Sequence, residues 1–382
     1  MRSSAAWILL ALSAALHGYL AWRLLPLLPA GPLPWLAGAY LLASALLLPL
    51  PLLARIVWQR DLPDALSGLG FLAMGVFSFL FVLSLLRELL LLLAQVLDWL
   101  HPELIPLSTL AQVSALAVLA LSAGLVLIGY RNARMLARVV QVDVPIAGLP
   151  EALHGFAIAQ ISDIHVGPTI KHDYLHKIVQ AVNALNADLV AVTGDVVDGS
   201  VAALRAHVAP LAQLRARHGV YAVTGNHEYY SGAPDWIAHW RELGLSVLLN
   251  EHAVLEHEGE RLLVAGVTDY SAHVFHREHR SDPHQALAGA PADIAMKLLL
   301  AHQPRSAERA AEAGFHLQLS GHTHGGQFLP WNFFVPLQQP FIAGLKRWQS
   351  LWVYTSRGTG YWGPPLRLGA PAEITHLRLV RA

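Results

Sequence analysis

The chain has 382 residues, of which 54% are hydrophobic and only 14% are charged, well below the roughly 25% that is usual for soluble domains. Its formal net charge is zero, so no overall positive field attracts nucleic acid. The absence of cysteine excludes disulfides, thiolate metal sites and cysteine nucleophiles, so any bound metal must be held by nitrogen and oxygen ligands.

Four long apolar stretches fill the first third of the chain, at residues 5–25, 33–56, 69–97 and 107–130. Each is long enough to supply the about 20 apolar residues that a helix needs to cross a bilayer. We therefore predict an all-α transmembrane region of four helices over residues 1–130. Arg2 followed by an apolar run is also typical of a signal peptide, but three more spans follow and no small-residue cleavage site is evident.

The third stretch contains two neighbouring charged residues, Arg87 and Glu88. Charges at membrane depth mark either a functional site or a structural contact near an interface or inside a helix bundle. We favour the structural interpretation, because this stretch is longer than a bilayer is thick.

Basic residues in the short loops predict the orientation of the spans, because cytoplasmic loops carry an excess of Lys and Arg. Arg55 and Arg60 lie between the second and third spans. Three more arginines follow the fourth span: Arg131, Arg134 and Arg138. The loop between the third and fourth spans carries Asp98 and Glu103 but no Lys or Arg. We therefore expect a multi-pass protein of the inner (cell) membrane with both ends on the cytoplasmic side.

Residues 131–153 form a basic juxtamembrane segment in which Pro145, Gly148 and Pro150 indicate a linker. From residue 154 to residue 382, short apolar runs alternate with segments of helical spacing. The predicted strands are Phe156–Ile161, Asp188–Thr193, Val220–Thr224, Ser246–Leu249, Ala253–Glu256, Arg261–Val267, Met296–Ala301, Leu317–Leu319, Leu351–Thr355 and Ile374–Val380. The predicted helices are Asp173–Leu185, Ala202–Arg217, Pro234–Leu243 and Ser306–Ala313. Strands and helices alternate in the first part of this region, and strands cluster in the later part. This order favours an α/β sandwich with mixed sheets between helices.

Polar residues directly follow five of the predicted strands. In chain order they are Asp163 and His165, Asp195 and Asp198, Asn226 and His227, His302, and finally His322 and His324. Taken singly, each has an ordinary structural interpretation as a turn residue, a helix cap or a buried histidine. Because ligands of open α/β sheets collect at the carboxyl ends of strands, five such ends together predict one metal site. From spacing alone, the last two histidines serve either one metal ion or two adjacent ions.

These motifs occur in the order of a known family. Asp163-x-His165, Gly194-Asp195-x-x-Asp198, Gly225-Asn226-His227-Glu228, His302 and Gly321-His322-x-His324 resemble the motifs of the calcineurin-like metallophosphoesterases. Three further stretches are similar to the bacterial membrane-associated branch of that family: Gly325-Gly326-Gln327, Arg357-Gly358-Thr359-Gly360 and Pro371-x-Glu373. The resemblance covers about residues 154–382. It implies a metallophosphoesterase-type four-layer αββα sandwich with mixed sheets as the catalytic domain.

By this resemblance, two divalent metal ions would be held by seven residues. One ion would bind Asp163, His165, Asp195 and His324, and the other Asp195, Asn226, His302 and His322. A carboxylate suits the bridging position of Asp195, because it has two oxygens, whereas a neutral imidazole has one free nitrogen. These nitrogen and oxygen ligands suit manganese, iron or zinc without selecting among them.

The resemblance also implies roles for residues beside the metals. His227 would assist the leaving group as general acid or hold a phosphate oxygen, or else only support a ligand through a hydrogen bond. With Asp195 it forms the predicted catalytic pair. Asp198 would orient His227 or the loops, and Glu228 would be structural. Arg357 is either a phosphate contact, because of its fork geometry, or a solvated loop arginine.

The leading functional hypothesis is a membrane-anchored phosphohydrolase that cleaves phosphomonoesters or phosphodiesters with a metal-activated hydroxide. An apolar group after the last motif either packs a long hairpin or forms a rim that presents a lipid-linked substrate. This group comprises Phe328, Leu329, Trp331, Phe333, Phe334, Phe341 and Trp348. The alternatives are a non-catalytic metal-dependent membrane sensor or regulatory module, and a metal-binding structural domain. The expected partners are the phosphoester substrate and the lipid bilayer, with neither nucleic acid nor an obligate protein partner.

Overall fold

The computed structural model describes residues 2–54, 57 and 62–382. The chain divides into two compact units, one of residues 1–131 with 363–366 and the other of residues 132–362 with 367–382. Each unit has a hydrophobic core of its own. Arg55 and Arg60, on which part of the predicted orientation rests, lie outside the described residues.

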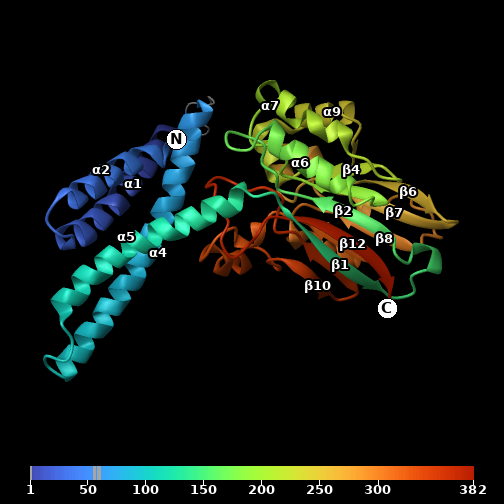
Figure 1. Ribbon diagram of the computed structural model, residues 1–382. Helices are drawn as coiled ribbons and strands as arrows, with labels where there is room; N and C mark the ends of the chain where they lie inside the picture. The colour runs from blue at the N-terminus through green and yellow to red at the C-terminus, as the bar shows by residue number, and fades with distance from the viewer. Residues whose placement is uncertain (1, 55–56, 58–61) are drawn as a thin grey trace. The chain divides into compact units, whose positions relative to one another are not determined.

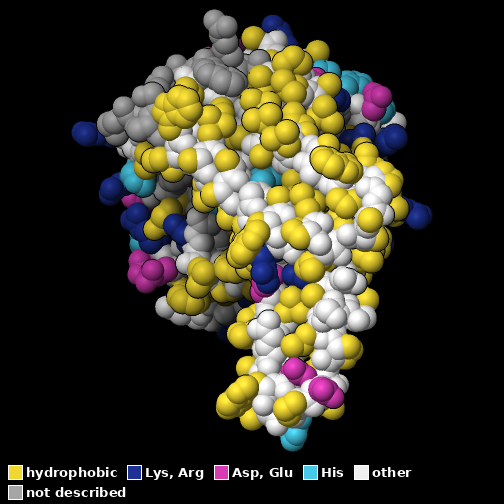
Figure 2. All heavy atoms as spheres, turned by 90° about the vertical axis from the view of Figure 1, so that its left-hand side faces the viewer, with side chains coloured by type: hydrophobic (Ala, Val, Ile, Leu, Met, Phe, Trp, Pro, Cys, Tyr) yellow, Lys and Arg dark blue, Asp and Glu magenta, His cyan; other side chains and the backbone are white. Residues whose placement is uncertain are grey.

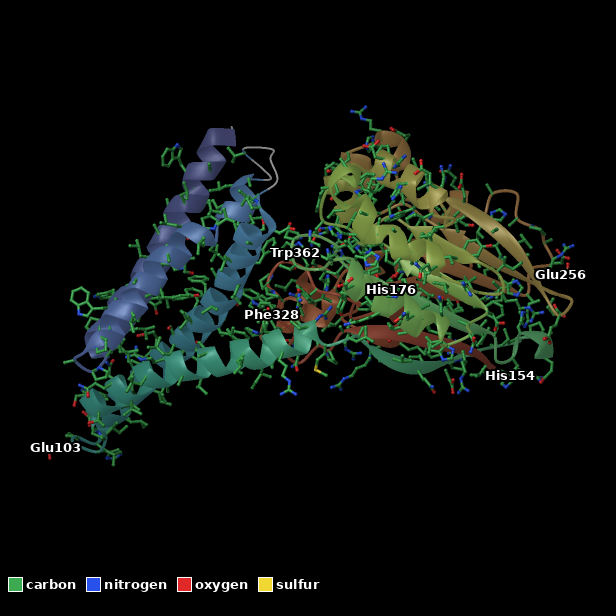
Figure 3. All side chains as sticks on the ribbon, turned by 45° about the horizontal axis from the view of Figure 1, so that its top comes forward. Glu103, His154, His176, Glu256, Phe328 and Trp362 are labelled. Carbon is green, nitrogen blue, oxygen red and sulfur yellow. The ribbon has the colours of Figure 1, made fainter. Side chains whose placement is uncertain are left out.

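The first unit consists of apolar helices: α1 (Arg2–Leu24), α2 (Pro32–Leu47), α3 (Leu50–Leu53), α4 (Asp64–Leu100) and α5 (Leu107–Arg134) (Figure 1). Four helical stretches are long and apolar enough to cross a membrane: Ala6–Leu27, Pro32–Leu53, Asp64–Leu100 and Leu107–Arg134. The short connection between α4 and α5 carries Glu103 (Figure 3). Large apolar side chains cover much of this surface (Figure 2), with Trp35 83% exposed and Leu127 70% exposed. An apolar surface of this extent is expected where helices face lipid.

A small polar cluster lies inside the helical unit. Arg87 on α4 is buried and donates to Ser114 Oγ on α5 at 3.0 Å and to the carbonyl of Ala111 at 3.1 Å. The adjacent Glu88 accepts from Arg87 at 3.0 Å and from Nε of Arg23 on α1 at 3.0 Å. These contacts join three helices, as the structural interpretation of the charged pair predicts.

The second unit contains two six-stranded sheets. The first sheet has the order β1-β12-β2-β3-β4-β5, with β1 (Arg138–Ile146), β2 (Ala157–Ile161), β3 (Leu189–Thr193), β4 (Val220–Val223), β5 (Ser246–Val247) and β12 (Glu373–Arg381). The second has the order β10-β11-β9-β8-β7-β6, with β6 (Glu251–His257), β7 (Glu260–Gly266), β8 (Met296–Leu300), β9 (Leu317–Ser320), β10 (Gly344–Trp348) and β11 (Leu351–Thr355). Both sheets are mixed: β2 to β5 are parallel, as are β7, β8, β9 and β11, and antiparallel strands flank them.

Helices cover the outer face of each sheet and complete four layers. The first sheet packs against α6 (His172–Asn183), α7 (Val201–Val208) and α9 (Ala233–Glu242) (Figure 1), and the second against α10 (Pro283–Ala286) and α11 (Ala307–Glu312). A separate apolar cluster, with Ile158, Leu298 and Leu319 wholly buried, fills the space between the sheets. The predicted sandwich is confirmed. Its central strands are continuous apolar runs because both of their faces are buried.

The segment predicted as a linker is largely a strand, which corrects the sequence interpretation of residues 131–153. Residues 138–146 form β1, which pairs in parallel with β12 over its full length. Val140, Val142 and Val144 alternate with more exposed polar residues, which is the pattern of a half-buried strand. Pro145 is tolerated because β1 lies at the edge of its sheet. The proline was therefore a misleading signal for a linker.

Candidate functional site

The polar residues at the five strand ends come together in space. Two groups of three have ligand atoms within 4.8 Å of one another: Asp163, His165 and His324, and Asp195, His302 and His322. A third group of the same compactness, formed by His165, Asp195 and His227, overlaps both. The structure therefore places the last two histidines in different, adjacent groups. Asn226 belongs to α8 (Asn226–Ser231), which begins directly after β4 and Gly225.

The turns that carry these residues have an unusual backbone conformation. Asp163, His165, Asp195, His322 and His324 all have positive φ, between 51° and 69°. Such left-handed values cost a non-glycine residue about 1–3 kcal/mol and recur at functional sites. With these φ values the side chains no longer alternate as they do in the preceding strand. Residues two positions apart therefore do not point in the same direction.

Two glycines allow the strand ends to approach one another. A Cβ atom at Gly321 would overlap the carboxylate of Asp163 and the hydroxyl of Ser162. A Cβ atom at Gly225 would overlap the carboxylate of Asp195. Because glycine lacks this atom, the ends of β9 and β4 lie directly against the carboxylates that follow β2 and β3.

Backbone N–H groups hold the two carboxylates in place. Both oxygens of Asp163 accept from the N–H of His322, at 2.9 and 3.0 Å. Oδ1 of Asp195 accepts from the N–H of His227 at 2.8 Å. Its Oδ2 is left facing the histidines, 3.1 Å from Nε2 of His302 and 4.0 Å from Nε2 of His227.

Acceptors at the outer ring nitrogens orient three imidazoles. Nδ1 of His302 donates to the carbonyl of Thr193 at 2.7 Å, so Nε2 is the ring nitrogen that faces the site. Nδ1 of His165 donates to Oδ2 of Asp198 at 3.2 Å, with the same result. Nδ1 of His227 donates to Oδ1 of the same carboxylate. Asp198 therefore orients two rings at once, in the way that carboxylates position metal-binding histidines.

The spacing of the donor atoms fits shared cations. Nε2 of His165 lies 3.0 Å from Nε2 of His324, and Nε2 of His302 lies 3.3 Å from Nδ1 of His322. Two ligands at about 2.1 Å from one ion lie about 3.0 Å apart in octahedral geometry and about 3.4 Å apart in tetrahedral geometry. Oδ1 of Asn226 is buried and has no hydrogen-bond partner among the described residues, as expected of an oxygen that is a metal ligand. The donor set therefore fits divalent metals.

Burial and neighbouring charges favour the protonation state that a metal requires for three of these residues but not for two others: although burial opposes it, the charge of Asp195 raises the pKa of His302, and burial raises the pKa of Asp163. Burial, together with the charge of His302, lowers the pKa of His322 to about 3. Burial, together with His165, holds the pKa of His324 well below its usual value. Although burial opposes it, the charge of His302 holds the pKa of Asp195 well below the usual range of a carboxyl group. Neutral imidazoles and an ionised carboxylate are the forms that bind cations.

Glu228 holds two of the strand-end loops together. The buried carboxylate accepts from the N–H groups of Val196 at 2.8 Å and Val197 at 3.3 Å through Oε1. Through Oε2 it accepts from those of Asp195 at 2.9 Å and Gly225 at 2.7 Å. The residue thus joins the loop after β3 to the start of α8, which agrees with its predicted structural role.

Two other buried residues lie beside the site and were not predicted. Asp269 accepts from Nε2 of Gln303 at 3.0 Å, and Gln303 directly follows His302. Arg367 donates to the carbonyl of His324 at 3.0 Å and to its Nδ1 at 3.1 Å. The strand-end pattern points to Asp269 as well, because it follows β7 closely. Nothing in the sequence distinguishes Arg367 from the other loop arginines.

Arg357 is paired in the structure. Its Nη1 lies 2.9 Å from Oε2 of Glu373, a buried residue that also accepts from the hydroxyl of Tyr354. About a third of the Arg357 side chain remains exposed, at 34%. Its predicted contact with phosphate stays a prediction.

Within the apolar group after the last motif only Trp348 lies in a hairpin, in which β10 pairs antiparallel with β11. The group includes two single turns of 3-10 helix within residues 331–337. Phe328 is buried, whereas Trp331, Phe333 and Phe334 are 42%, 71% and 54% exposed. Packing therefore accounts for Phe328 but not for the three exposed rings.

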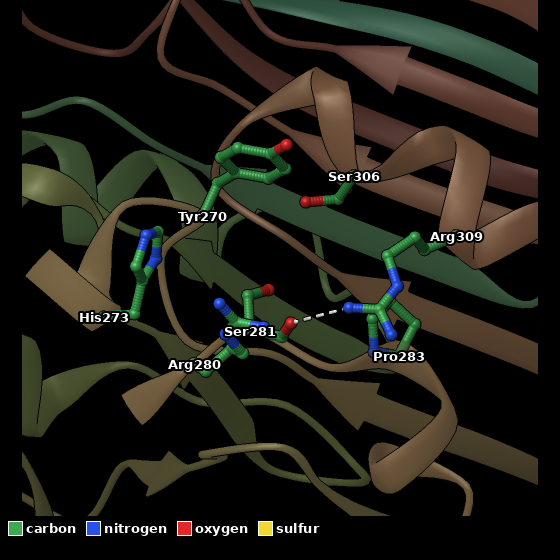
Figure 4. A pocket seen from close by; sticks show the side chains of 7 residues that line it. All are labelled: Tyr270, His273, Arg280, Ser281, Pro283, Ser306 and Arg309. Carbon is green, nitrogen blue, oxygen red and sulfur yellow. Dashed lines mark hydrogen bonds between the residues drawn. The ribbon is translucent and has the colours of Figure 1, made fainter. Parts of the chain in front are cut away.

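A separate cavity of about 310 Å³ adjoins the loop after β7 (Figure 4). It is lined by Tyr270, His273, Arg280, Ser281, Pro283, Ser306 and Arg309. Arg309 donates to the carbonyl of Ser281 at 3.4 Å across one side of it (Figure 4). None of these lining residues carries a carboxylate, so the cavity lacks the donor set of a divalent metal centre.

Comparison with known proteins gives one family match and several relatives. The calcineurin-like phosphoesterase family matches residues 156–326, which contain all five strand ends. A transmembrane protein with metallophosphoesterase domain from Danio rerio is 36% identical over 332 residues, which cover 84% of this chain and 75% of that protein. The protein of the same name from Bos taurus is 41% identical over 70% of this chain and 62% of its own length. A Helicobacter pylori protein named uncharacterized metallophosphoesterase is 38% identical over 58% of this chain and 59% of its own. The chain thus spans less than two thirds of the last two relatives.

Proposed function

The chain belongs to the calcineurin-like phosphoesterase family, and we propose that it is a membrane-anchored hydrolase that cleaves phosphomonoesters or phosphodiesters at a centre of two divalent metal ions. Membership of a metal-dependent family agrees with the clustered Asp and His side chains, which are able to bind metals. The observation that carries the proposal is the convergence of five strand ends on two adjacent ligand groups and a third, formed by His165, Asp195 and His227, that overlaps both.

The proposed ligand sets follow the two groups. One set is Asp163, His165, Asp195 and His324, and the other is Asp195, Asn226, His302 and His322. Two observations support this division: Oδ2 of Asp195 faces the histidines, 3.1 Å from Nε2 of His302, and the oxygen of Asn226 is unpartnered among the described residues. We propose manganese, iron or zinc as the metals, because oxygen and imidazole ligands suit all three.

The chemistry supplied by two adjacent divalent ions, when bound, is activation of a water for attack and neutralisation of charge on the phosphoryl group. The protein supplies the proton for the leaving oxygen. His227 is the proposed donor, because its Nδ1 is held by Asp198 while its Nε2 faces the site 4.0 Å from Asp195. Although burial opposes it, the charges of His227 and His165 keep the pKa of Asp198 below its usual value, so the carboxylate stays ionised and stabilises the protonated ring.

Two partly exposed aromatic rings flank the proposed proton donor. The ring of Tyr230 lies 5.2 Å from that of His227, and the ring of Trp362 lies 5.9 Å from it. Tyr230 is 49% exposed and Trp362 is 43% exposed, so both present apolar surface where a substrate approaches. We infer that they contact the leaving group and exclude water from its oxygen.

We further propose that the protein lies in the cell membrane with its catalytic domain on the cytoplasmic side. The relatives from Bos taurus and Danio rerio are named transmembrane proteins. Arginines cluster at and just after the end of α5, whereas the end of α4 and the α4–α5 connection carry Asp98 and Glu103 without Lys or Arg. A C-terminal reporter that is active only in the cytoplasm tests this orientation, and activity of an exported reporter instead would contradict it.

The function is tested by hydrolysis of a generic aryl phosphodiester by the full-length protein. We expect turnover that depends on manganese, iron or zinc, is abolished by Asp195→Asn and falls at least about 100-fold with His227→Ala. His172→Ala is the matched control, because His172 lies on α6 with 47% of its side chain exposed. Absence of turnover with all three metals would favour the non-catalytic sensor or structural domain.

A further inference from the structure

The apolar segment that follows the last motif borders a second pocket, of about 580 Å³. This volume is within the range of about 300–1,000 Å³ that is typical of small-molecule sites. Its apolar wall includes Phe328, Leu329, Phe341, Ile342 and Leu368. The pocket therefore offers a mostly hydrocarbon lining to a ligand.

Three polar side chains interrupt this lining. Lys346 and Arg357 place positive charge at the pocket, although Arg357 also pairs with Glu373, and no carboxylate is among the described residues that line it. Oδ1 of Asn332 is buried and lacks a hydrogen-bond partner within the described part of the chain. An apolar wall, two cations and one free acceptor together match an amphiphile whose head is anionic and carries a hydroxyl group.

The surface around this pocket is unusually apolar for a segment in contact with water. Residues 328–343 contain no Asp, Glu, Lys or Arg. Leu329 at the pocket is 42% exposed, and the neighbouring Phe333 and Leu337 are 71% and 84% exposed. Exposed apolar segments of this kind mark contact with lipid or with a partner. The four apolar helices of the chain favour lipid as the contact.

The pocket is directly connected to the candidate metal centre. Gly325 lines the pocket and follows His324 in the chain. Arg357 lines it as well and precedes Gly358, which packs against both His324 and Asp163. A head group held near Arg357 is therefore close to the residues that would bind the metals.

We propose that this pocket binds the acyl chain of a lipid phosphoester, so that the substrates of the enzyme are phosphate-bearing lipids. The inference rests on the proposed phosphoesterase function and names its substrate class. The apolar wall takes the chain, and Lys346 and Arg357 attract the phosphate of the head group. A soluble phosphoester without a chain uses the metal centre but gains nothing from the pocket.

The test is a homologous series of n-alkyl phosphates, each kept below its micelle concentration, with phenyl phosphate as the chain-free reference. Phosphate release is measured with the full-length protein in nanodiscs of zwitterionic lipid. We expect kcat/KM to rise about two- to fourfold per added methylene until the pocket is filled, which is the effect of burying one methylene from water. Phenyl phosphate turnover reports whether each variant is folded and active.

Two variants and one control assign the effect to this pocket. Ala343→Trp fills the pocket and Leu329→Ser makes its wall polar, and both should flatten the chain-length dependence while phenyl phosphate turnover is kept. Leu337→Ser is the control, because Leu337 is highly exposed and does not line the pocket, and it should keep the dependence.

Each alternative result has a distinct meaning. A flat series in the wild type with intact phenyl phosphate turnover overturns the lipid pocket and leaves the phosphoesterase function standing. A rising series that neither pocket variant changes overturns the assignment to this pocket. Absence of turnover on every ester of the series and on the aryl phosphodiester as well overturns the proposed function and this inference with it.

Discussion

Replacing Glu228 by glutamine tests whether one buried carboxylate holds the strand-end loops in place. The carboxylate is wholly buried and accepts from four backbone N–H groups, two at each oxygen. Glutamine has nearly the same shape, but one oxygen becomes an amide nitrogen that donates and cannot accept. In either amide orientation, two buried N–H groups therefore lose their acceptor.

The cost follows from the strength of these hydrogen bonds. Burial raises the pKa of Glu228 to about 8, so the comparison is made at about pH 9, where the carboxylate is ionised. Hydrogen bonds to charged groups contribute about 1.5–3 kcal/mol each, so two lost acceptors cost about 3–6 kcal/mol. For domains of about 150–250 residues, each kcal/mol lowers Tm by about 2–4 °C. We therefore expect Glu228→Gln to lower the Tm of the second unit by at least about 6 °C. Because one of the four donors is the N–H of Asp195, metal affinity should fall as well.

Thermal unfolding of the full-length protein in detergent, followed by tryptophan fluorescence, measures this effect. Glu242→Gln is the matched control, because Glu242 on α9 is 68% exposed and pairs with the ring of His239 at 3.1 Å. The control should unfold within about 2 °C of wild type. The reasoning is refuted if Glu228→Gln also unfolds within about 2 °C of wild type.

Four further perturbations test other parts of the account. Asp198→Asn should lower kcat for an aryl phosphate at least about 100-fold with little change in KM, because it removes the charge that orients two imidazoles. An unchanged kcat would count against this role of Asp198. In the metal-free protein, lowering the pH from about 7.5 to about 5 should reduce the Tm of the His322→Gln variant less than it reduces the Tm of wild type. The pKa of His322 is about 3 in the folded chain and 6.5 in the unfolded chain, so the stability of wild type falls as the pH drops below 6.5. An equal decrease in the Tm of variant and wild type would refute this. Removing metals with a chelator should abolish turnover, and adding back manganese, iron or zinc should restore it; turnover that survives chelation would contradict a metal centre. Replacing Trp331, Phe333 and Phe334 together by serine should weaken activity on lipid phosphoesters more than on a soluble aryl phosphate, whereas equal losses would show that the rings serve only packing.

The polar residues at the strand ends could be predicted because the sequence pattern that marks them, an apolar run followed by a polar residue, is local. Asp163, Asp195 and His302 each follow a short apolar run within three residues, and such runs form buried strands whose carboxyl ends meet. The contacts between these ends are not local and could not be predicted. The N–H of His322 holds the carboxylate of Asp163 across 159 positions in the chain. The orienting bond from His302 to Thr193 spans 109 positions.

Two differences between sequence and structure have a local physical cause. The spacing of His322 and His324 left open whether they serve one ion or two, because the rule that alternate residues share a face applies to extended strands. Their φ values of 69° and 51° place both in left-handed turns, where that rule fails. Residues 138–146 were predicted as part of a linker because Pro145 is unusual within a strand, and the edge position that tolerates it in β1 cannot be recognised from sequence.

The most direct test of the two-metal account is the rate of phosphodiester hydrolysis as metal is added back to the metal-free protein in known ratios. We predict that the rate reaches its plateau at two equivalents per chain. His227→Ala should take up the same two equivalents but turn over at least about 100-fold more slowly. A plateau at one equivalent, or no hydrolysis at any ratio, would contradict the account.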